Sequence, residues 1–404
     1  MTIAVTDILL FIVLPSLGVI AIIAFVWIAA FYRSRVASVG RAVRVQTLAP
    51  FNPDPKPAQG GVSVVVVAGD DCVALERLLN QIFEQEFSQP MEVIVVNDGK
   101  NEDVKDVVTR MKHLSHRPNL YATFTPPGLR NISNRKLALT LGIKAAHYPI
   151  IIAVTEQSRI YSNQWLARLA EPFSQSGIEV VIGSALPSAK LDSGSGKRYR
   201  SFINVADAVE WLSAALRGKP YRAHRANMAF THDAFFRVGG FNGALNLRDG
   251  DDDIFISKIV RRGNFAVVCA AQAAVRYTHP DPARLMREER PARFYSRGKS
   301  GRSSSLFFGF SSLMIWTLVL ITCIGGILSG LLNEWAFLSG FVGMLLSAWV
   351  ILAVTWRKTL KALRCHPISI MVLPGLLRRP FTNFWHRMYG RKHHGEYHTW
   401  SSKK

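Results

Sequence analysis

Carboxylates stand at two places in this sequence where they could take part in chemistry. Asp98 follows the apolar stretch 93–96 and precedes Gly99, whereas Asp251, Asp252 and Asp253 lie far downstream. A carboxylate at the carboxyl end of a strand in an open α/β sheet lies where a nucleotide would bind. Adjacent carboxylates raise one another's pKa, which suits a general base that works near neutrality.

Both groups also have plainer structural interpretations. Asp98 and Gly99 are common turn residues, because Asp bonds locally and Gly adopts positive φ. The three aspartates could instead form the exposed acidic start of a helix over 254–260, where they would favour its dipole, although that benefit needs only one or two carboxylates. We favour a functional role for both groups because the first ends a predicted strand and the second contains more charge than a helix terminus requires.

The surrounding sequence predicts a sheet that would position these residues. Buried-type strands alternate with segments of helical spacing, a pattern typical of a parallel sheet with helices on both faces. The predicted strands are 62–67, 93–96 and 149–154, with a further apolar run at 180–182, and the predicted helices start near Leu75 and cover 104–111 and 133–146. A Pro/Gly-rich linker at 51–61 precedes the first strand.

Three uncharged stretches, 8–32, 306–332 and 335–356, are long enough to cross a bilayer. We interpret the first as an anchor, since it lacks the basic start of a signal peptide and exceeds the usual apolar length. The predicted organisation is an anchor (1–33), a basic segment with the linker (34–60), a cytoplasmic α/β domain (61–300), a membrane hairpin (301–356) and a basic tail (357–404). In the tail, stretch 368–377 is interrupted by Pro374 and is expected at the membrane interface.

Basic residues flank these stretches unevenly. Lys and Arg follow the first span, precede the second and follow the third, but are absent from residues 1–32 and from the 333–334 turn. Because cytoplasmic flanks carry the positive excess, the N-terminus should face outward and the domain and tail inward, at the inner (plasma) membrane. Attraction to anionic membrane lipids also accounts for much of the net charge of +21, so we do not expect a nucleic-acid partner. The four scattered cysteines predict neither a disulfide framework nor a zinc site.

Over roughly residues 61–300 the sequence resembles the family 2 glycosyltransferases of the GT-A fold, in its membrane-anchored bacterial form. The resemblance rests on the order of several segments, which are 62–71, 97–99, 133–146, 221–241 and 250–254. It implies an α/β GT-A fold with a Rossmann-like, mostly parallel sheet, together with three transmembrane helices. It also implies that Asp252 or Asp251 is the catalytic base, and we prefer Asp252. The donor-binding residues that it implies are Ala68, Asp71, Asp98, Arg135 and Lys136.

The sequence departs from the family at the metal site. Counting back from Trp165, the position of the usual Asp-x-Asp holds Thr155, Glu156 and Gln157. Glu156 could still coordinate Mg²⁺ or Mn²⁺ with Gln157 and the donor diphosphate, because Mg²⁺ often uses one or two protein carboxylates. His279 is a further candidate ligand. Alternatively, Arg135, Lys136 or Arg159 could neutralise the diphosphate without a metal.

The resemblance therefore implies a cell-envelope enzyme that transfers one sugar from a nucleotide-sugar donor to a membrane-associated acceptor, such as a lipid-linked glycan of polysaccharide biosynthesis. Single transfer is expected because segment 289–297 lacks the Gln-x-x-Arg-Trp motif of processive members. The altered metal position also supports an alternative, in which the chain is a non-catalytic membrane scaffold or a nucleotide-sugar-binding partner of another transferase.

Overall fold

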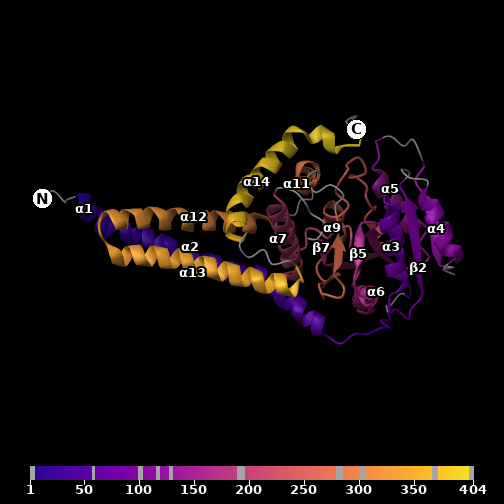
Figure 1. Cartoon of the computed structure of the whole chain (residues 1–404). Coiled ribbons are helices and arrows are strands. Elements are labelled where there is room, and N and C mark those ends of the chain that lie inside the picture. The colour runs from indigo at the N-terminus through magenta and orange to yellow at the C-terminus, as the bar shows by residue number, and fades with distance from the viewer. Residues whose placement is uncertain are drawn as a thin grey trace. The chain divides into compact units, whose positions relative to one another are not determined.

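The computed structural model describes residues 5–56, 60–98, 103–114, 119–126, 131–188, 196–278, 285–299, 305–365 and 372–399. The chain divides into two compact units (Figure 1). One unit comprises Met1–Arg41, Gly196–Ser213 and Ser303–Phe384, and the other comprises Ala42–Ser195, Ala214–Arg302 and Trp385–Lys404. The second unit therefore combines most of the predicted α/β region with the C-terminal tail, whereas Gly196–Ser213 of that region belongs to the first unit.

The α/β unit is built on a seven-stranded sheet with the order β3-β2-β1-β4-β8-β6-β9. Its strands are β1 (Val62–Ala68), β2 (Met91–Asn97), β3 (Leu120–Phe124), β4 (Ile150–Thr155), β6 (Val180–Gly183), β8 (Met228–Thr231) and β9 (Phe265–Val268). Only β8 runs antiparallel to its neighbours, β4 and β6. The sheet is therefore mostly parallel, which confirms the predicted fold class. A smaller sheet pairs β10 (Val275–Tyr277) with β5 (Ser158–Ile160) and β7 (Ala185–Pro187).

Helices flank the main sheet (Figure 1). They are α3 (Cys72–Phe83), α4 (Asp103–Leu114), α5 (Asn134–Lys144) and α6 (Trp165–Ala170), followed later by α8 (His232–Arg237) and α9 (Ile254–Ile259). Helix α11 (Arg290–Lys299) lies against α9. Helix α5 lies very close to the sheet, since a Cβ added at Gly142 would come within 2.5 Å of Val65 and 2.8 Å of Val96. Glycine is therefore required there, and it lets the last turn of α5 pack directly on β1 and β2.

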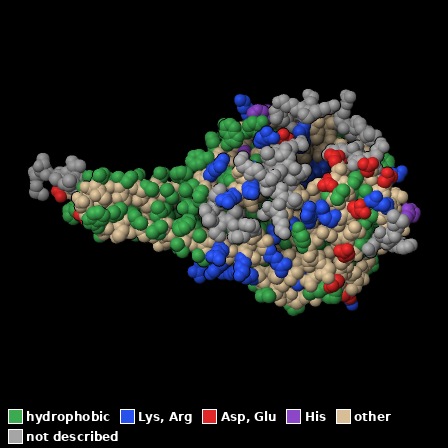
Figure 2. Space-filling model, viewed as in Figure 1, with side chains coloured by type: hydrophobic (Ala, Val, Ile, Leu, Met, Phe, Trp, Pro, Cys, Tyr) green, Lys and Arg blue, Asp and Glu red, His purple; other side chains and the backbone are tan. Residues whose placement is uncertain are grey.

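The other unit contains the helices predicted to span a membrane. These are α2 (Leu14–Leu48), α12 (Ser305–Leu331) and α13 (Trp335–Ala362). Two short segments, α1 (Val5–Ile8) and η1 (Leu9–Val13), precede α2. All three are long and apolar enough to cross a bilayer. Hydrophobic side chains cover most of their visible surface (Figure 2), as expected of helices that face lipid. Helix α2 continues through the basic residues that follow the predicted anchor.

Two later helices differ from the sequence-based expectation. Helix α7 (Lys197–Leu216) was not predicted, and α14 (Val372–Lys392) begins two residues before Pro374 and continues through Pro380. Residues 368–371 lie outside the described residues, so the interruption of stretch 368–377 at Pro374 stays a prediction. Pro374 lies in the first turn, where a missing N–H costs little. Tertiary contacts stabilise the rest of α14, because its buried Arg379 pairs with Asp207 at 2.9 Å and with Glu210, both on α7.

Candidate active site

At the carboxyl ends of β1, β2 and β4, the predicted donor-binding residues Ala68, Asp71 and Asp98 lie next to Glu156 and Gln157. The N–H of Asp98 donates to the carbonyl of Ala68 at 3.1 Å, so these two predicted residues are adjacent. The N–H of Gly69 donates to Glu156 Oε2 at 2.5 Å, and Gln157 Nε2 donates to Asp71 Oδ2 at 3.3 Å. Strand register produces this cluster, since parallel strands end at the same edge of a sheet.

Asp71 and Glu156 each have a structural role in this cluster. Asp71 caps α3, because its Oδ1 accepts from the N–H of Ala74 at 2.9 Å. Burial raises the pKa of Glu156, although hydrogen bonds from Gly69, Gln157 and Asp71 oppose that rise. Glu156 therefore holds the loop after β1 against the loop after β4.

The first turn of α5 connects this donor-side edge to the acidic group. Asn134 Nδ2 donates to the carbonyl of Asp98 at 3.4 Å, and Arg135 Nε lies 3.1 Å from Asp251 Oδ2. Lys136, which is fully buried, donates to the carbonyls of Ala244, Leu247 and Asp249 at 2.6–2.8 Å. All three N–H donors of Lys136 therefore hold the loop before the aspartates, and its predicted contact with the donor stays a prediction.

The acidic residues follow Gly250, whose φ of +109° is one that residues other than glycine rarely adopt. Asp251, Asp252 and Asp253 are all buried, so their charges need partners. Arg225 Nη2 lies 2.6 Å from Asp249 and 3.2 Å from Asp251. Arg222 donates twice to Asp252 Oδ2, from Nη2 at 2.9 Å and from Nε at 3.2 Å.

These arginines reverse the pKa shift expected for adjacent carboxylates. Burial raises the pKa of Asp251, but Arg135 and Arg225 outweigh it and leave the pKa below its usual value. Burial is likewise outweighed at Asp252 by Arg222, Arg225 and Arg293, so that pKa is also lowered. The argument that mutual repulsion would raise the pKa of both residues is therefore wrong, because it left the arginines out.

Asp253 behaves differently from its neighbours. Its Oδ1 accepts from the N–H of Ile254 at 2.6 Å and caps α9, and its Oδ2 accepts from the Ser296 hydroxyl at 2.6 Å. Burial and the charge of Asp252 raise its pKa to about 6. Asp253 is thus the helix-capping member of the group, but all three aspartates are buried, so the alternative of an exposed acidic helix start is wrong.

His224 lies beside the arginines as a neutral imidazole. Burial, followed by the charge of Arg222, lowers its pKa well below 6.5. Its ring stacks on Tyr277 at 4.3 Å, and its Nδ1 accepts from the N–H of Ala226 at 3.2 Å. This arrangement leaves Nε2 as the protonated nitrogen, so His224 adds no positive charge to the cluster.

The arginines of segment 222–225 and Arg293 were not identified as site residues from the sequence. A usable signal was present, since Arg222 and Arg225 are three residues apart in a segment that leads into the buried strand β8. The nearby Asn227 anchors this segment, because it accepts from Trp165 Nε1 at 3.0 Å and donates to the carbonyls of Ser184 and Ala273.

The described residues do not form a ready metal site at the predicted position. Within the described ranges, no three His, Cys, Asp or Glu side chains gather closely enough to hold an ion. Hydrogen bonds to the loop already engage Glu156, and Gln157 Oε1 accepts from the Thr278 hydroxyl at 3.1 Å. His279 lies outside the described residues. Metal binding by Glu156, Gln157 and His279 stays a prediction, and no reaction step is assigned to a metal.

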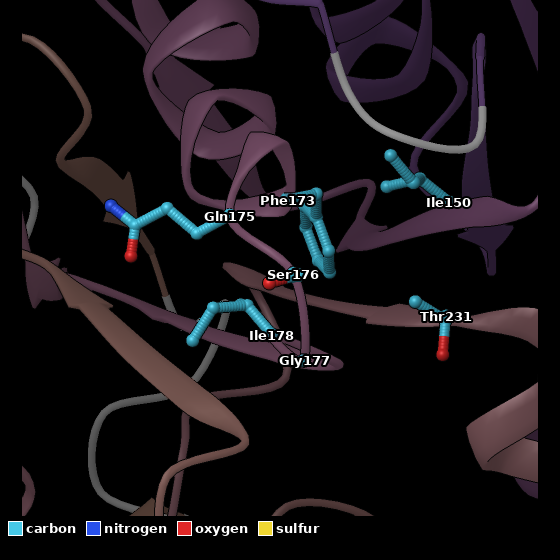
Figure 3. Close-up of a pocket in the computed structure, with 7 residues that line it drawn as sticks. All are labelled: Ile150, Phe173, Gln175, Ser176, Gly177, Ile178 and Thr231. Atoms are coloured by element: carbon cyan, nitrogen blue, oxygen red, sulfur yellow. The ribbon is translucent and has the colours of Figure 1, made fainter.

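A small pocket lies away from this site. It encloses about 50 Å³ and is lined by residues from the opposite end of β4 and the segment before β6 (Figure 3), namely Ile150, Phe173, Gln175, Ser176, Gly177, Ile178 and Thr231. Its Gln175 side chain points away from Phe173 in this view. The pocket is too small for a nucleotide, and its lining contains no ionisable side chain.

The fold has a counterpart among solved structures. Mannosyltransferase PcManGT from Pyrobaculum calidifontis, in complex with GDP-Man and Mn²⁺, is 17% identical and aligns over 92% of this chain and 99% of its own, with a TM-score of 0.51. No protein-family model and no curated protein matches the chain. At this identity the similarity shows a GT-A-like glycosyltransferase fold and nothing further about the reaction.

Two other structures align more loosely. GalNAc-T7 with UDP, GalNAc and Mn²⁺ is 16% identical over 63% of this chain and 55% of its own, with a TM-score of 0.40. Glucosyl-3-phosphoglycerate synthase from Mycobacterium tuberculosis, in complex with phosphoglyceric acid, is 14% identical over 61% and 82%, with a TM-score of 0.39.

Proposed function

We propose that this chain is a membrane-bound glycosyltransferase of the family 2 type. It transfers one sugar from a nucleotide-sugar donor to a membrane-associated acceptor, with a lipid-linked glycan as the preferred candidate. The observation that carries the proposal is a pair of contacts made by adjacent residues of α5. Asn134 donates to the carbonyl of Asp98 at the donor-side strand edge, and Arg135 pairs with the Asp251 carboxylate. The three helices long enough to cross a bilayer support an acceptor held at the membrane.

Asp251 is the better candidate for the general base. Arg222 holds Asp252 through two hydrogen bonds, and Asp253 caps a helix, whereas neither oxygen of Asp251 accepts a hydrogen bond from the described residues. Its two contacts are ion pairs with Arg135 and Arg225. Asp251 therefore retains acceptor capacity, but both of its oxygens are buried, so an acceptor hydroxyl reaches them only when the site opens around Asp251.

In the proposed reaction the acceptor oxygen forms a bond to the anomeric carbon while the bond from that carbon to the diphosphate oxygen breaks. The acceptor proton passes to Asp251, and the leaving diphosphate takes the electron pair. In this proposal Arg135 and Arg225 stabilise that charge, because bidentate and charge-assisted hydrogen bonds to phosphate are strong. As these arginines turn from Asp251 to the diphosphate, the pKa of Asp251 rises toward the range of a useful base.

The test is turnover of the full-length protein in lipid nanodiscs with a panel of uridine and guanosine diphosphate sugars and a membrane-lipid extract as acceptor. Asp251→Asn should lower kcat by about 10²- to 10⁴-fold, the usual contribution of a general base. Asp233→Asn changes an exposed carboxylate and should match the wild type. Wild-type turnover in Asp251→Asn would contradict the assignment. A parallel assay in chelator, with Glu156→Gln beside it, tests the predicted metal dependence.

A non-catalytic scaffold that binds nucleotide sugar is the second candidate. Its support is the engagement of Glu156 by the neighbouring loop, at the position where the family supplies metal ligands. Calorimetric binding of a donor without transfer or hydrolysis, in Mg²⁺, Mn²⁺ or chelator, would favour this alternative.

A further inference from the structure

The last described residues of the chain lie along the loop that precedes the aspartates. After the short helix η6 (His394–Tyr397), His398 forms an antiparallel bridge with Leu247. The N–H of Arg248 donates to the carbonyl of Tyr397 at 2.9 Å, and the N–H of Thr399 donates to the carbonyl of Asn246 at 2.9 Å. A strand-like pairing thus joins two segments separated by about 150 residues in the sequence.

Helix α11 contacts both partners of this pairing, because Tyr295 packs on Ala244 and Leu247 of the loop as well as on the C-terminal segment. The Tyr295 hydroxyl lies 3.3 Å from His398 Nε2, and its ring packs 5.7 Å from that of Tyr397. The next residue, Ser296, donates to Asp253. The end of α14 also packs closely on α11, since a Cβ at Gly390 would lie 2.9 Å from the carbonyl oxygen of Pro291.

Lys136 holds the same loop from α5. It binds the carbonyl of Leu247, and the adjacent residues Asn246 and Arg248 are hydrogen-bonded to the C-terminal segment. Glycines with positive φ stand just before this loop at 243 and at its end at 250, which makes its backbone intrinsically adaptable. The loop therefore depends on tertiary contacts for its conformation, and the C-terminal segment supplies two of its backbone hydrogen bonds.

We propose that residues 394–399 form a positioning strap that fixes loop 244–250 and thereby the carboxylate of Asp251. The strap acts through the loop and touches neither donor nor acceptor. Its catalytic consequence rests on the proposed function, but its effect on loop order does not. A small displacement of a catalytic group lowers kcat much more than it lowers donor affinity.

The test compares full-length protein in nanodiscs with a chain that ends at His393 and a control chain that ends at Thr399. Loss of the strap should increase hydrogen exchange in peptide 244–253 while leaving strand β1 protected. It should also lower kcat by about tenfold or more, with donor KM nearly unchanged. The control chain should match the full-length protein in both measurements.

A point variant tests the same contact if the chain that ends at His393 does not fold. Thr399→Pro removes the N–H that donates to Asn246, whereas Thr399→Ala retains it. Faster exchange in peptide 244–253 for the proline variant alone supports the strap. Equal exchange in both variants and in both truncated chains would overturn it, and exchange reports on the strap even if no donor is turned over.

Discussion

Asp253 has different electrostatic surroundings from the two aspartates before it. Asp251 and Asp252 each lie about 3 Å from a guanidinium nitrogen, whereas the hydrogen-bond donors to Asp253 are a hydroxyl and a backbone N–H. Neutral donors offset a buried negative charge less than a guanidinium does. One residue of the three is therefore set to titrate near pH 6 while its neighbours stay ionised.

Replacement of Asp253 by Asn should alter the pH dependence of stability. The pKa of Asp253 rises from 3.8 to about 6 on folding, so its stabilising contribution is complete below pH 3.8 and is lost as pH rises through about 6. Asn keeps the cap but does not titrate. The Tm of Asp253→Asn relative to wild type should therefore increase between pH 4.5 and 7.5, by the equivalent of at most about 3 kcal/mol.

Thermal unfolding of the detergent-solubilised protein at those two pH values provides the measurement. Asp233→Asn, an exposed carboxylate, is the control and should show no such trend. A difference in Tm that is the same at both pH values would show that Asp253 does not titrate in this range.

Helix α14 presents an apolar stripe on its exposed side. Phe381, Phe384, Trp385 and Met388 recur at helical spacing and are 62%, 66%, 66% and 47% exposed. Exposed basic residues flank the stripe at Arg378, Arg387, Arg391 and Lys392. Trp316 of α12 donates to the carbonyl of Leu377 at 3.1 Å and packs edge-on against Phe381, which ties the start of α14 to a helix that could span a bilayer. This combination is typical of a helix that lies in an anionic membrane interface.

We therefore expect α14 to insert its aromatic side chains into the membrane surface. Spin labels at Trp385→Cys and Arg387→Cys, which are two residues apart and therefore on opposite sides of the helix, should report opposite environments in nanodiscs with anionic lipid, in chains without the native cysteines. The label at 385 should be more accessible to oxygen, which partitions into lipid, and the label at 387 to an aqueous nickel chelate. Equal exposure of both labels to the nickel chelate would argue against an interfacial helix.

At the scale of the whole molecule, the arrangement across the membrane follows from the distribution of basic residues. Asn333, in the short turn between α12 and α13, should face outward, while the α/β unit and the tail face the cytoplasm. A cysteine at Asn333 should react with an impermeant thiol reagent in intact cells, and one at Ser402 should react only after permeabilisation. The reverse pattern would place the aspartates on the side away from cytoplasmic nucleotide sugars.

Local patterns in the sequence were sufficient to predict the strands and helices that carry the site residues. The apolar runs that became β1, β2 and β4, the spacing that became α3 and α5, and the three long apolar helices are properties of neighbouring residues. Periodicity and length therefore predicted them. The order of the strands also placed Ala68, Asp98 and Glu156 at one edge, as expected for parallel strands.

Tertiary structure alone decided how the acidic group is held. The partners of Asp251 and Asp252 are Arg135, Arg222 and Arg225, and two of these come from segment 222–225, whose arginines were not identified as site residues from the sequence. The pairing of Thr399 with Asn246 and the continuation of α14 through Pro380 likewise depend on residues far apart in the chain. Electrostatic energies vary with the distance between charges and with burial, and folding sets both. The sequence thus specified which carboxylates could act, and packing determined which of them are ionised, capped or available.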